Sequence, residues 1–192
     1  MGLFVNSISD LPFNEERSYY LYVLDYYGWD EPVSNTLKAN IDRIASLCAS
    51  HNAVMIKGLP DSHFQSEVLS WVKINGQDPQ LILPALLITT VHPKYFVDAN
   101  NSPVDTEITD RIIFLKIREL CKTPQDVVTL IEKIFSDIKL FKKIKDFNIV
   151  KELRTNEHGA LVDALILQPN FIGVGVDIKK LVSWLNSKKD TK

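Results

Sequence analysis

The strongest hydrophobic pattern is an apolar run over residues 18–27 that contains five tyrosines. Aromatic and β-branched residues favour strands, and a glycine followed by a proline ends this run. The run is apolar on both of its faces, which is typical of a central strand that is covered on each side. We therefore predict a buried central β-strand at this place in the chain.

Two later stretches have the period of a helix. Between residues 34 and 51, apolar side chains recur at steps of four, three and four, at Leu37, Ile41, Ile44 and Cys48. A longer helix is predicted to begin at Thr123-Pro124, because proline is tolerated at the first helical position. Its core-facing stripe is expected to consist of Val127, Ile131, Ile134, Ile138 and Phe141.

Shorter patterns supply the remaining elements of a domain. Apolar runs predict strands at 53–59, 81–91 and 111–117, and a helix is expected after Ser62, where Phe64, Val68, Trp71 and Val72 share a face. The polar interval 98–110 is loop-length, so the last two of these strands can pair antiparallel.

The order of elements predicts an α/β fold in which a mixed sheet is flanked by helices. Alternating strands and helices require parallel crossovers, whereas the last pair of strands requires an antiparallel hairpin. We expect an N-terminal arm at residues 1–17, the domain itself at 18–145, and a C-terminal strand-and-helix extension at 146–192 packed on the same domain. Within the extension, 147–153 fits either a strand or a continued helix; short strands are expected at 160–167 and 171–176, with a last helix after Asp177.

Composition limits the classes of partner. The chain has 192 residues, a net charge of −2 and a pI of about 6.1, so nothing indicates binding to nucleic acid or to an anionic membrane. Its longest nearly apolar run is too short to cross a bilayer, and its first residues lack the pattern of a signal peptide. Two cysteines do not form a disulfide scaffold. We therefore expect a cytoplasmic globular protein with no nucleic-acid or membrane partner.

Two motifs resemble the thioredoxin-like superfamily. Residues 24–33 read L-D-Y-Y-G-W-D-E-P-V, which is similar to the family's strand end V-D-F-W-A-x-W-C-G-P-C, with one residue fewer before the tryptophan. Residues 83–88 read L-P-A-L-L-I and look like the run in which the family places a cis-proline before its third strand. The resemblance covers about residues 18–145 and implies a thioredoxin-like sheet with flanking helices.

The chain departs from that family at the reactive pair. Asp30 and Val33 stand where the resemblance places the two cysteines, and thiol–disulfide exchange requires both thiols. The resemblance therefore implies a degenerate member, more in keeping with a non-catalytic module than with an enzyme. The family's groove beside the cis-proline holds an extended peptide by strand addition, which needs no cysteine. We expect a protein or extended peptide to bind here, at Tyr27, Trp29, Asp30, Glu31, Pro84 and Ala85.

Two alternatives to a peptide-binding module stay open. In the first, the chain is an enzyme that uses carboxylates: burial raises the pKa of Asp25, and Asp25 and Asp30 act as acid or base. We favour the structural interpretation of the same residues, in which Asp25 is hydrogen-bonded in the sheet while Asp30 and Glu31 charge a helix N-terminus favourably. In the second alternative, the chain is a subunit of a larger assembly, and residues 146–192 supply the contact.

No cofactor or metal is expected. Cys48 and Cys121 are interpreted as buried structural thiols, because most free cysteines are of that kind. None of the four histidines has the spacing of a metal ligand; they are His51, His63, His92 and His158. The pair Gly173-x-Gly175 lacks the third glycine of a dinucleotide fingerprint.

Overall fold

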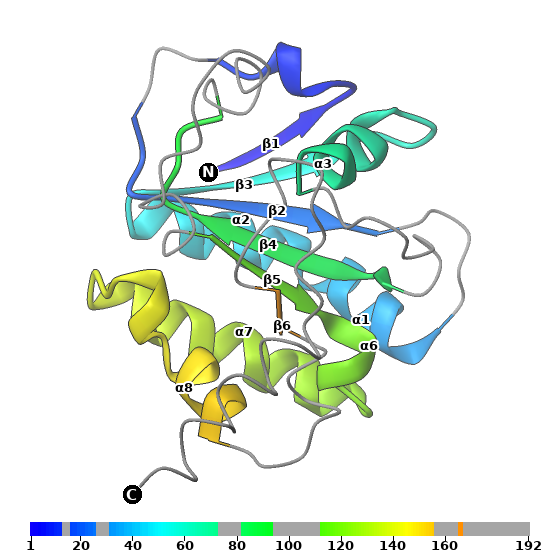
Figure 1. Cartoon of the computed structure of the whole chain (residues 1–192). Coiled ribbons are helices and arrows are strands. Elements are labelled where there is room, and N and C mark those ends of the chain that lie inside the picture. Colours follow the sequence, from blue (N-terminus) through cyan, green and yellow to red (C-terminus); the bar gives the residue numbers. More distant parts are fainter. Residues whose placement is uncertain (13–15, 26–30, 73–81, 94–111, 156–164, 167–192) are drawn as a thin grey trace, which may run out of the picture.

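A computed structural model describes residues 1–12, 16–25, 31–72, 82–93, 112–155 and 165–166 (Figure 1). In this part of the chain six strands form one sheet in the order β1-β3-β2-β4-β5-β6. β1, β3 and β2 are mutually parallel, whereas β4, β5 and β6 each pair antiparallel with the preceding strand of that order. The predicted α/β fold with a mixed sheet is confirmed, with strands β1 (Gly2–Val5), β2 (Tyr19–Leu24), β3 (Ala53–Gly58), β4 (Ala85–Thr89), β5 (Ile112–Lys116) and β6 (Leu165–Ile166).

Helices cover both faces of this sheet (Figure 1). One face packs on α1 (Pro32–Ala39), α2 (Ile41–Ser50), α7 (Pro124–Lys139) and α8 (Asn148–Thr155). The opposite face packs on α3 (Phe64–Val72) and on the short 3₁₀ helix η1 (Ile8–Asp10). All six residues of β2 are buried, because its side chains alternate between the two cores. The prediction of a central strand covered on each side is therefore confirmed.

The helix predicted between residues 34 and 51 is two helices separated at Asn40. The Asn40 side-chain amide donates to the carbonyl of Thr36 at 2.9 Å, and its backbone N–H donates to that carbonyl and to the carbonyl of Leu37, both at 3.2 Å. These bonds close α1 and let a new helix begin at Ile41. Of the predicted stripe, Leu37, Ile44 and Cys48 are buried, while Ile41 is partly buried against the same core.

The predicted start of α7 is confirmed, and one residue of its predicted stripe is wrong. Thr123 is the N-cap: its side chain accepts from the Asp126 N–H at 3.3 Å, while the Asp126 carboxylate accepts from the Thr123 N–H at 2.8 Å. The first four positions of the stripe are buried, but Phe141 is exposed because the helix ends at Lys139.

The chain ends differ from expectation in two places. Residues 2–5 were expected to lie in an irregular arm, but they form β1 and pair with β3 in register from Gly2–Met55 to Val5–Gly58. A four-residue edge strand is too short to leave a clear period in the sequence. The segment that fitted either a strand or a continued helix belongs largely to the separate helix α8, which follows the 3₁₀ helix η3 (Ile144–Asp146).

Other expectations can be followed only in part. The helix after Ser62 is confirmed as α3, the strand at 160–167 is represented by β6, and the antiparallel pair of strands is β4 with β5. The polar interval 98–110, the strand at 171–176 and the helix after Asp177 lie outside the described residues.

Candidate functional site

The predicted site lies at one end of the sheet, where β2, β3 and β5 end and β4 begins (Figure 1). We call this end of the strands the Pro84 edge. Pro84 comes directly before β4, and the Leu83–Pro84 peptide bond, whose isomer the sequence left open, is cis. The Pro84 carbonyl accepts from the Ile117 N–H at 2.9 Å. Ala85 pairs with Leu24 of β2 on one side and with Lys116 of β5 on the other. The backbone of Pro84 and Ala85 therefore occupies the middle of this edge.

A two-bond ion pair fixes the start of α1 beside the same edge. Arg118 lies in α6 (Ile117–Leu120), immediately after β5. Its Nε donates to Glu31 Oε2 at 3.0 Å and its Nη2 donates to Glu31 Oε1 at 2.9 Å. Bidentate arginine–carboxylate pairs are directional as well as strong. The pair therefore holds residue 31 beside the helix that follows β5, and the charge of Glu31 is already matched within the chain.

Asp25 is the buried carboxylate of this edge. It directly follows β2 and is only 2% exposed. Its Oδ1 accepts from the Ser34 hydroxyl at 2.9 Å, and its Oδ2 lies 3.6 Å from Lys38 Nζ. The backbone carbonyl of Asp25 accepts from Gln65 Nε2 at 3.1 Å. Side chains from α1 and α3 therefore meet at this one residue.

Burial raises the pKa of Asp25 above its usual value, as the alternative of a carboxylate-dependent enzyme supposed. The Ser34 hydrogen bond and the charges of Lys38 and Lys57 act in the opposite direction, because each favours the ionised carboxylate. Burial is the largest of these effects. The carboxyl group therefore holds its proton more tightly than a solvated aspartate does.

Two buried lysines at this edge were missed by the sequence analysis. Lys57 in β3 and Lys116 in β5 are each 5% exposed. Lys116 Nζ lies 3.1 Å from Glu119 Oε1, and the charge of Lys57 acts on Asp25. A lysine inside an apolar strand run was the available signal, because an ammonium group is rarely buried without an ionic or hydrogen-bonding partner.

The structure brings three of the six predicted binding residues to one edge. Glu31 is half-exposed and paired with Arg118, while Pro84 and Ala85 are buried. The remaining three, Tyr27, Trp29 and Asp30, lie outside the described residues.

Comparison of the chain with models of protein families, with curated proteins and with solved structures finds no match. Among the described residues, no group of three or more His, Cys, Asp or Glu side chains could hold a metal ion. No described helix is both long enough and apolar enough to cross a membrane. The candidate site is therefore defined by the geometry of this chain alone.

Neither cysteine belongs to this site. Cys48 and Cys121 are free and buried, which confirms the prediction of buried thiols. Burial raises the pKa of each thiol to about 12. Both are therefore protonated at neutral pH, and a protonated thiol is a poor nucleophile.

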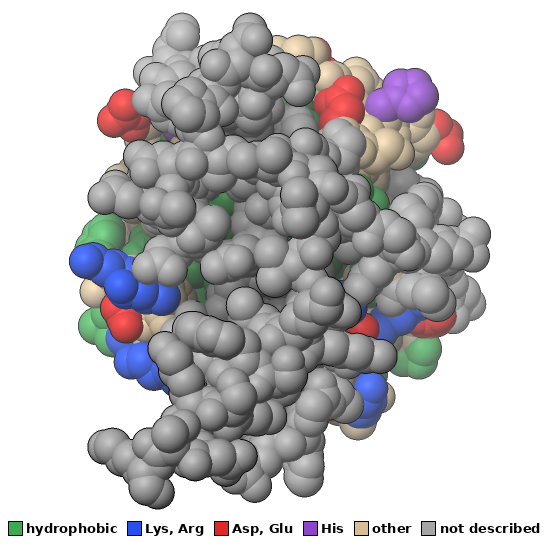
Figure 2. Space-filling view, viewed as in Figure 1, with side chains coloured by type: hydrophobic (Ala, Val, Ile, Leu, Met, Phe, Trp, Pro, Cys, Tyr) green, Lys and Arg blue, Asp and Glu red, His purple; other side chains and the backbone are tan. Residues whose placement is uncertain are grey.

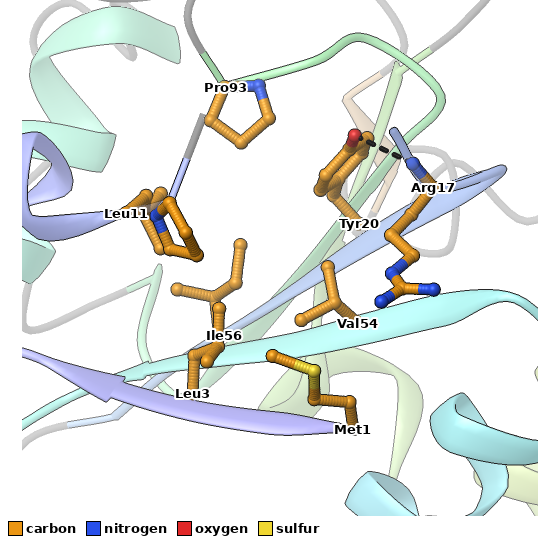
Figure 3. Close-up of a pocket in the computed structure, with 9 residues that line it drawn as sticks. Met1, Leu3, Leu11, Arg17, Tyr20, Val54, Ile56 and Pro93 are labelled. Carbon is orange, nitrogen blue, oxygen red and sulfur yellow. Dashed lines mark hydrogen bonds between the residues drawn. The ribbon is translucent and has the colours of Figure 1, made fainter. Parts of the chain in front are cut away.

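An apolar pocket lies elsewhere, beside β1 and the 3₁₀ helix η1 (Figure 3). Its wall includes Leu3, Leu11 and Val54, and at its rim the Tyr20 hydroxyl accepts from the Arg17 backbone N–H at 3.0 Å. The volume of the pocket is about 20 Å³, about the size of one water molecule. This pocket is too small to receive a metabolite.

Proposed function

We propose that this chain is a thioredoxin-like, non-catalytic module that binds a protein or an extended peptide at the edge around Pro84. The observation that carries the proposal is the sheet itself. Three parallel strands, β1, β3 and β2, are followed by antiparallel β4 and β5, and Pro84 directly precedes β4. A mixed sheet with helices on both faces, and a proline directly before β4, support this proposal.

The residues at the former reactive positions support binding without thiol chemistry. Val33 is partly buried and packs against the core, and Asp30 stands at the other position. Neither side chain can attack a disulfide. The two cysteines of the chain lie in the core with raised pKa values, so they do not substitute for the missing pair.

The proposed mode of binding is strand addition. An extended peptide gains affinity from main-chain hydrogen bonds, and neighbouring side chains select its sequence. Pro84 and Ala85 are buried, so we assign them the role of shaping the backbone at the base of the groove. Tyr27 and Trp29 would contact the peptide side chains. Because Arg118 already matches Glu31, attraction of a basic peptide would depend on Asp30.

A peptide array probed with the full-length chain tests this proposal. The best-bound linear peptides are then measured in solution against Trp29→Ala and Pro84→Ala, with circular dichroism as a check of folding. We expect each substitution to weaken binding about tenfold or more, as for the central contact of an interface. Phe4→Ala is the matched control, because Phe4 is exposed and lies on the edge strand β1. Binding that survives both site substitutions would rule out this site.

A disulfide-reduction assay with insulin as substrate separates this proposal from a redox function. We expect no reduction above the level of the Cys48→Ala, Cys121→Ala double variant, which has no thiol. Reduction by the wild-type chain that this double variant loses would refute the non-redox interpretation.

One observation favours the alternative of a carboxylate-dependent enzyme, namely the raised pKa of Asp25. That alternative predicts a bell-shaped pH–rate profile for a turnover and loss of the turnover in Asp25→Asn. A peptide-binding chain instead retains its peptide affinity in Asp25→Asn, because the buried carboxylate does not touch the peptide.

A further inference from the structure

The end of α7 exposes two large apolar side chains next to each other. Leu140 and Phe141 are each 64% exposed, more than any other large hydrophobic residue in the described part of the chain. Phe141 also has a backbone φ of 51°, in the left-handed region. Bulky residues rarely adopt this conformation, because their Cβ atom crowds the backbone. Because Phe141 is exposed, burial of its side chain does not offset the free-energy cost of this backbone conformation.

The hydrogen bonds of the turn show why this conformation is required. The Phe141 N–H donates to the carbonyl of Ile138 at 2.9 Å, and the Lys142 N–H donates to the carbonyl of Asp137 at 3.2 Å. This is the Schellman pattern at a helix C-terminus, and glycine is the usual residue at the left-handed position. A phenylalanine stands where the fold alone would favour glycine, and such outliers often mark a functional residue.

The backbone of the turn is held by contacts on both sides. Lys142 Nζ lies 2.6 Å from the buried Asp137 carboxylate, and the Lys142 carbonyl accepts from the Tyr19 hydroxyl at 2.6 Å. These contacts anchor the turn to α7 and to the start of β2. The backbone positions from which the two apolar side chains project are therefore set by the fold.

Exposed lysines flank the apolar pair along the chain. Lys139, Lys143 and Lys145 are all exposed within five residues of Phe141. Apolar and basic side chains lie together at the edge of the molecule where α7 ends (Figure 2). Lysines near a helix C-terminus complement the helix dipole. The dipole explains the lysines, but it does not explain the exposure of Leu140 and Phe141.

We propose that Leu140 and Phe141, together with the lysines around them, form a docking knob for a protein partner whose apolar pocket is bordered by aspartate and glutamate. Apolar side chains in a pocket would supply the central contact, and the lysines would align the partner through charge. This surface is a second one, independent of the site at Pro84. α7 has 16 residues and is therefore about 24 Å long. It begins soon after β5, beside the Pro84 site, and the knob lies at its other end.

Other occupants fit the knob less well. Residues 177–192 of this chain carry five lysines and two aspartates, so they are positively charged and would be repelled by the lysines of the knob. A second copy lacks a suitable receptor in the pocket beside β1, because about 20 Å³ cannot hold a phenyl ring. A lipid surface needs only apolar area and gives no reason for a phenylalanine at a left-handed backbone position. A shaped protein pocket does require its ligand side chain to project from a defined position.

A phage-displayed library of random linear peptides is the probe for this knob. It is selected on the full-length chain and counter-selected on Phe141→Gly. Glycine removes the ring and suits the left-handed position, so the variant folds with a melting temperature that is unchanged or raised by up to about 4 °C. We expect the selected peptides to combine aspartate or glutamate with aromatic or aliphatic residues. We expect their affinity to fall about tenfold or more in Phe141→Gly.

Charge variants and a matched control make the test specific. The double variant Lys139→Glu, Lys143→Glu reverses the charge beside the knob, so we expect it to weaken binding and to remove the salt dependence. Phe4→Ala also removes an exposed phenylalanine, 51% exposed on β1, and we expect it to leave the affinity unchanged. A selected peptide that competes with the ligand of the Pro84 site would contradict the independence of the two surfaces.

Several outcomes would overturn the proposal. They are a selection that enriches no sequence, a selection that enriches basic peptides, and an affinity that Phe141→Gly leaves unchanged. Phe141-dependent binding to vesicles of phosphatidylcholine and phosphatidylserine would assign the knob to a membrane instead. A concentration-dependent dimer in sedimentation velocity that Phe141→Gly abolishes would assign it to a second copy.

Discussion

Asp137 is the buried carboxylate on which the end of α7 depends, and we expect Asp137→Ala to destabilise the fold strongly. The side chain of Asp137 has no solvent exposure. It accepts from Lys142 Nζ at 2.6 Å and from the backbone N–H of Asn148, the first residue of α8, at 2.5 Å. One side chain therefore joins α7, the turn after it and the next helix.

The size of the effect follows from these two bonds. A hydrogen bond to a charged group contributes roughly 1.5–3 kcal/mol, and alanine removes both bonds. The contribution of Lys142 falls at the low end of that range, because its side chain is 27% exposed and can turn to water. We therefore expect a loss of about 3 kcal/mol, which is about two orders of magnitude in the folding equilibrium. For a chain of this length the melting temperature should fall by about 6–12 °C.

Urea unfolding followed by circular dichroism measures this loss. Glu152→Ala is the matched control, because it breaks the exposed pair between Glu152 and Lys133, whose atoms lie 2.7 Å apart. We expect the control to cost less than about 1 kcal/mol, as is usual for surface pairs. Asp137→Asn keeps an acceptor for the Asn148 N–H, so its loss of stability should lie between those of Asp137→Ala and Glu152→Ala. A loss in Asp137→Ala no larger than that of the control would refute this account of the α7–α8 connection.

Three further predictions concern the rest of the fold. The protonated form of Asp25 contributes stability that is fully present below its unfolded pKa of 3.8 and is lost as pH rises through its raised folded pKa. Asp25→Asn should therefore gain stability relative to the wild type as pH rises across that window, and a pH-independent difference in urea unfolding would contradict this. With pKa values of about 12, Cys48 and Cys121 should react with a thiol reagent at pH 8 only after unfolding; rapid labelling of the native chain would show that one of them is accessible. Thr123→Ala should cost about 1 kcal/mol by removing the N-cap of α7, and Thr123→Ser should restore most of that stability in the same unfolding assay.

The fold class could be predicted because the strongest patterns belong to its most buried elements. α7 is long and its apolar period matches the face that it buries, while β2 is apolar on both faces and is buried on both. β1 escaped prediction because an edge strand of four residues has too few positions for a period. The end of α7 was misplaced because apolar spacing continues to Phe141, while the backbone turns at Leu140. Spacing reports which side chains could share a face, but not where the helix stops.

The candidate site could be predicted only where one short segment carries the signal. Pro84 was found from its sequence context, whereas the isomer of its peptide bond is fixed by the folded structure. The pairing of Glu31 with Arg118 joins residues 87 positions apart, and no local pattern links them. Lys57 and Lys116 could have been noticed as charges inside apolar strands. Which groups surround these two lysines could not be predicted, because that depends on the register of four strands.

Asp25 is the residue on which the binding and enzymatic hypotheses differ most. A catalytic carboxyl group has to reach the substrate, yet Asp25 is 2% exposed and its side chain is engaged by Ser34 and Lys38 of α1. Its backbone carbonyl is engaged by Gln65 of α3, which packs on the opposite face of the sheet. The raised pKa has burial as its largest cause, so it follows from this position and does not require a catalytic role. The contacts of this carboxylate with both helical layers at the end of β2 therefore favour a structural role for Asp25.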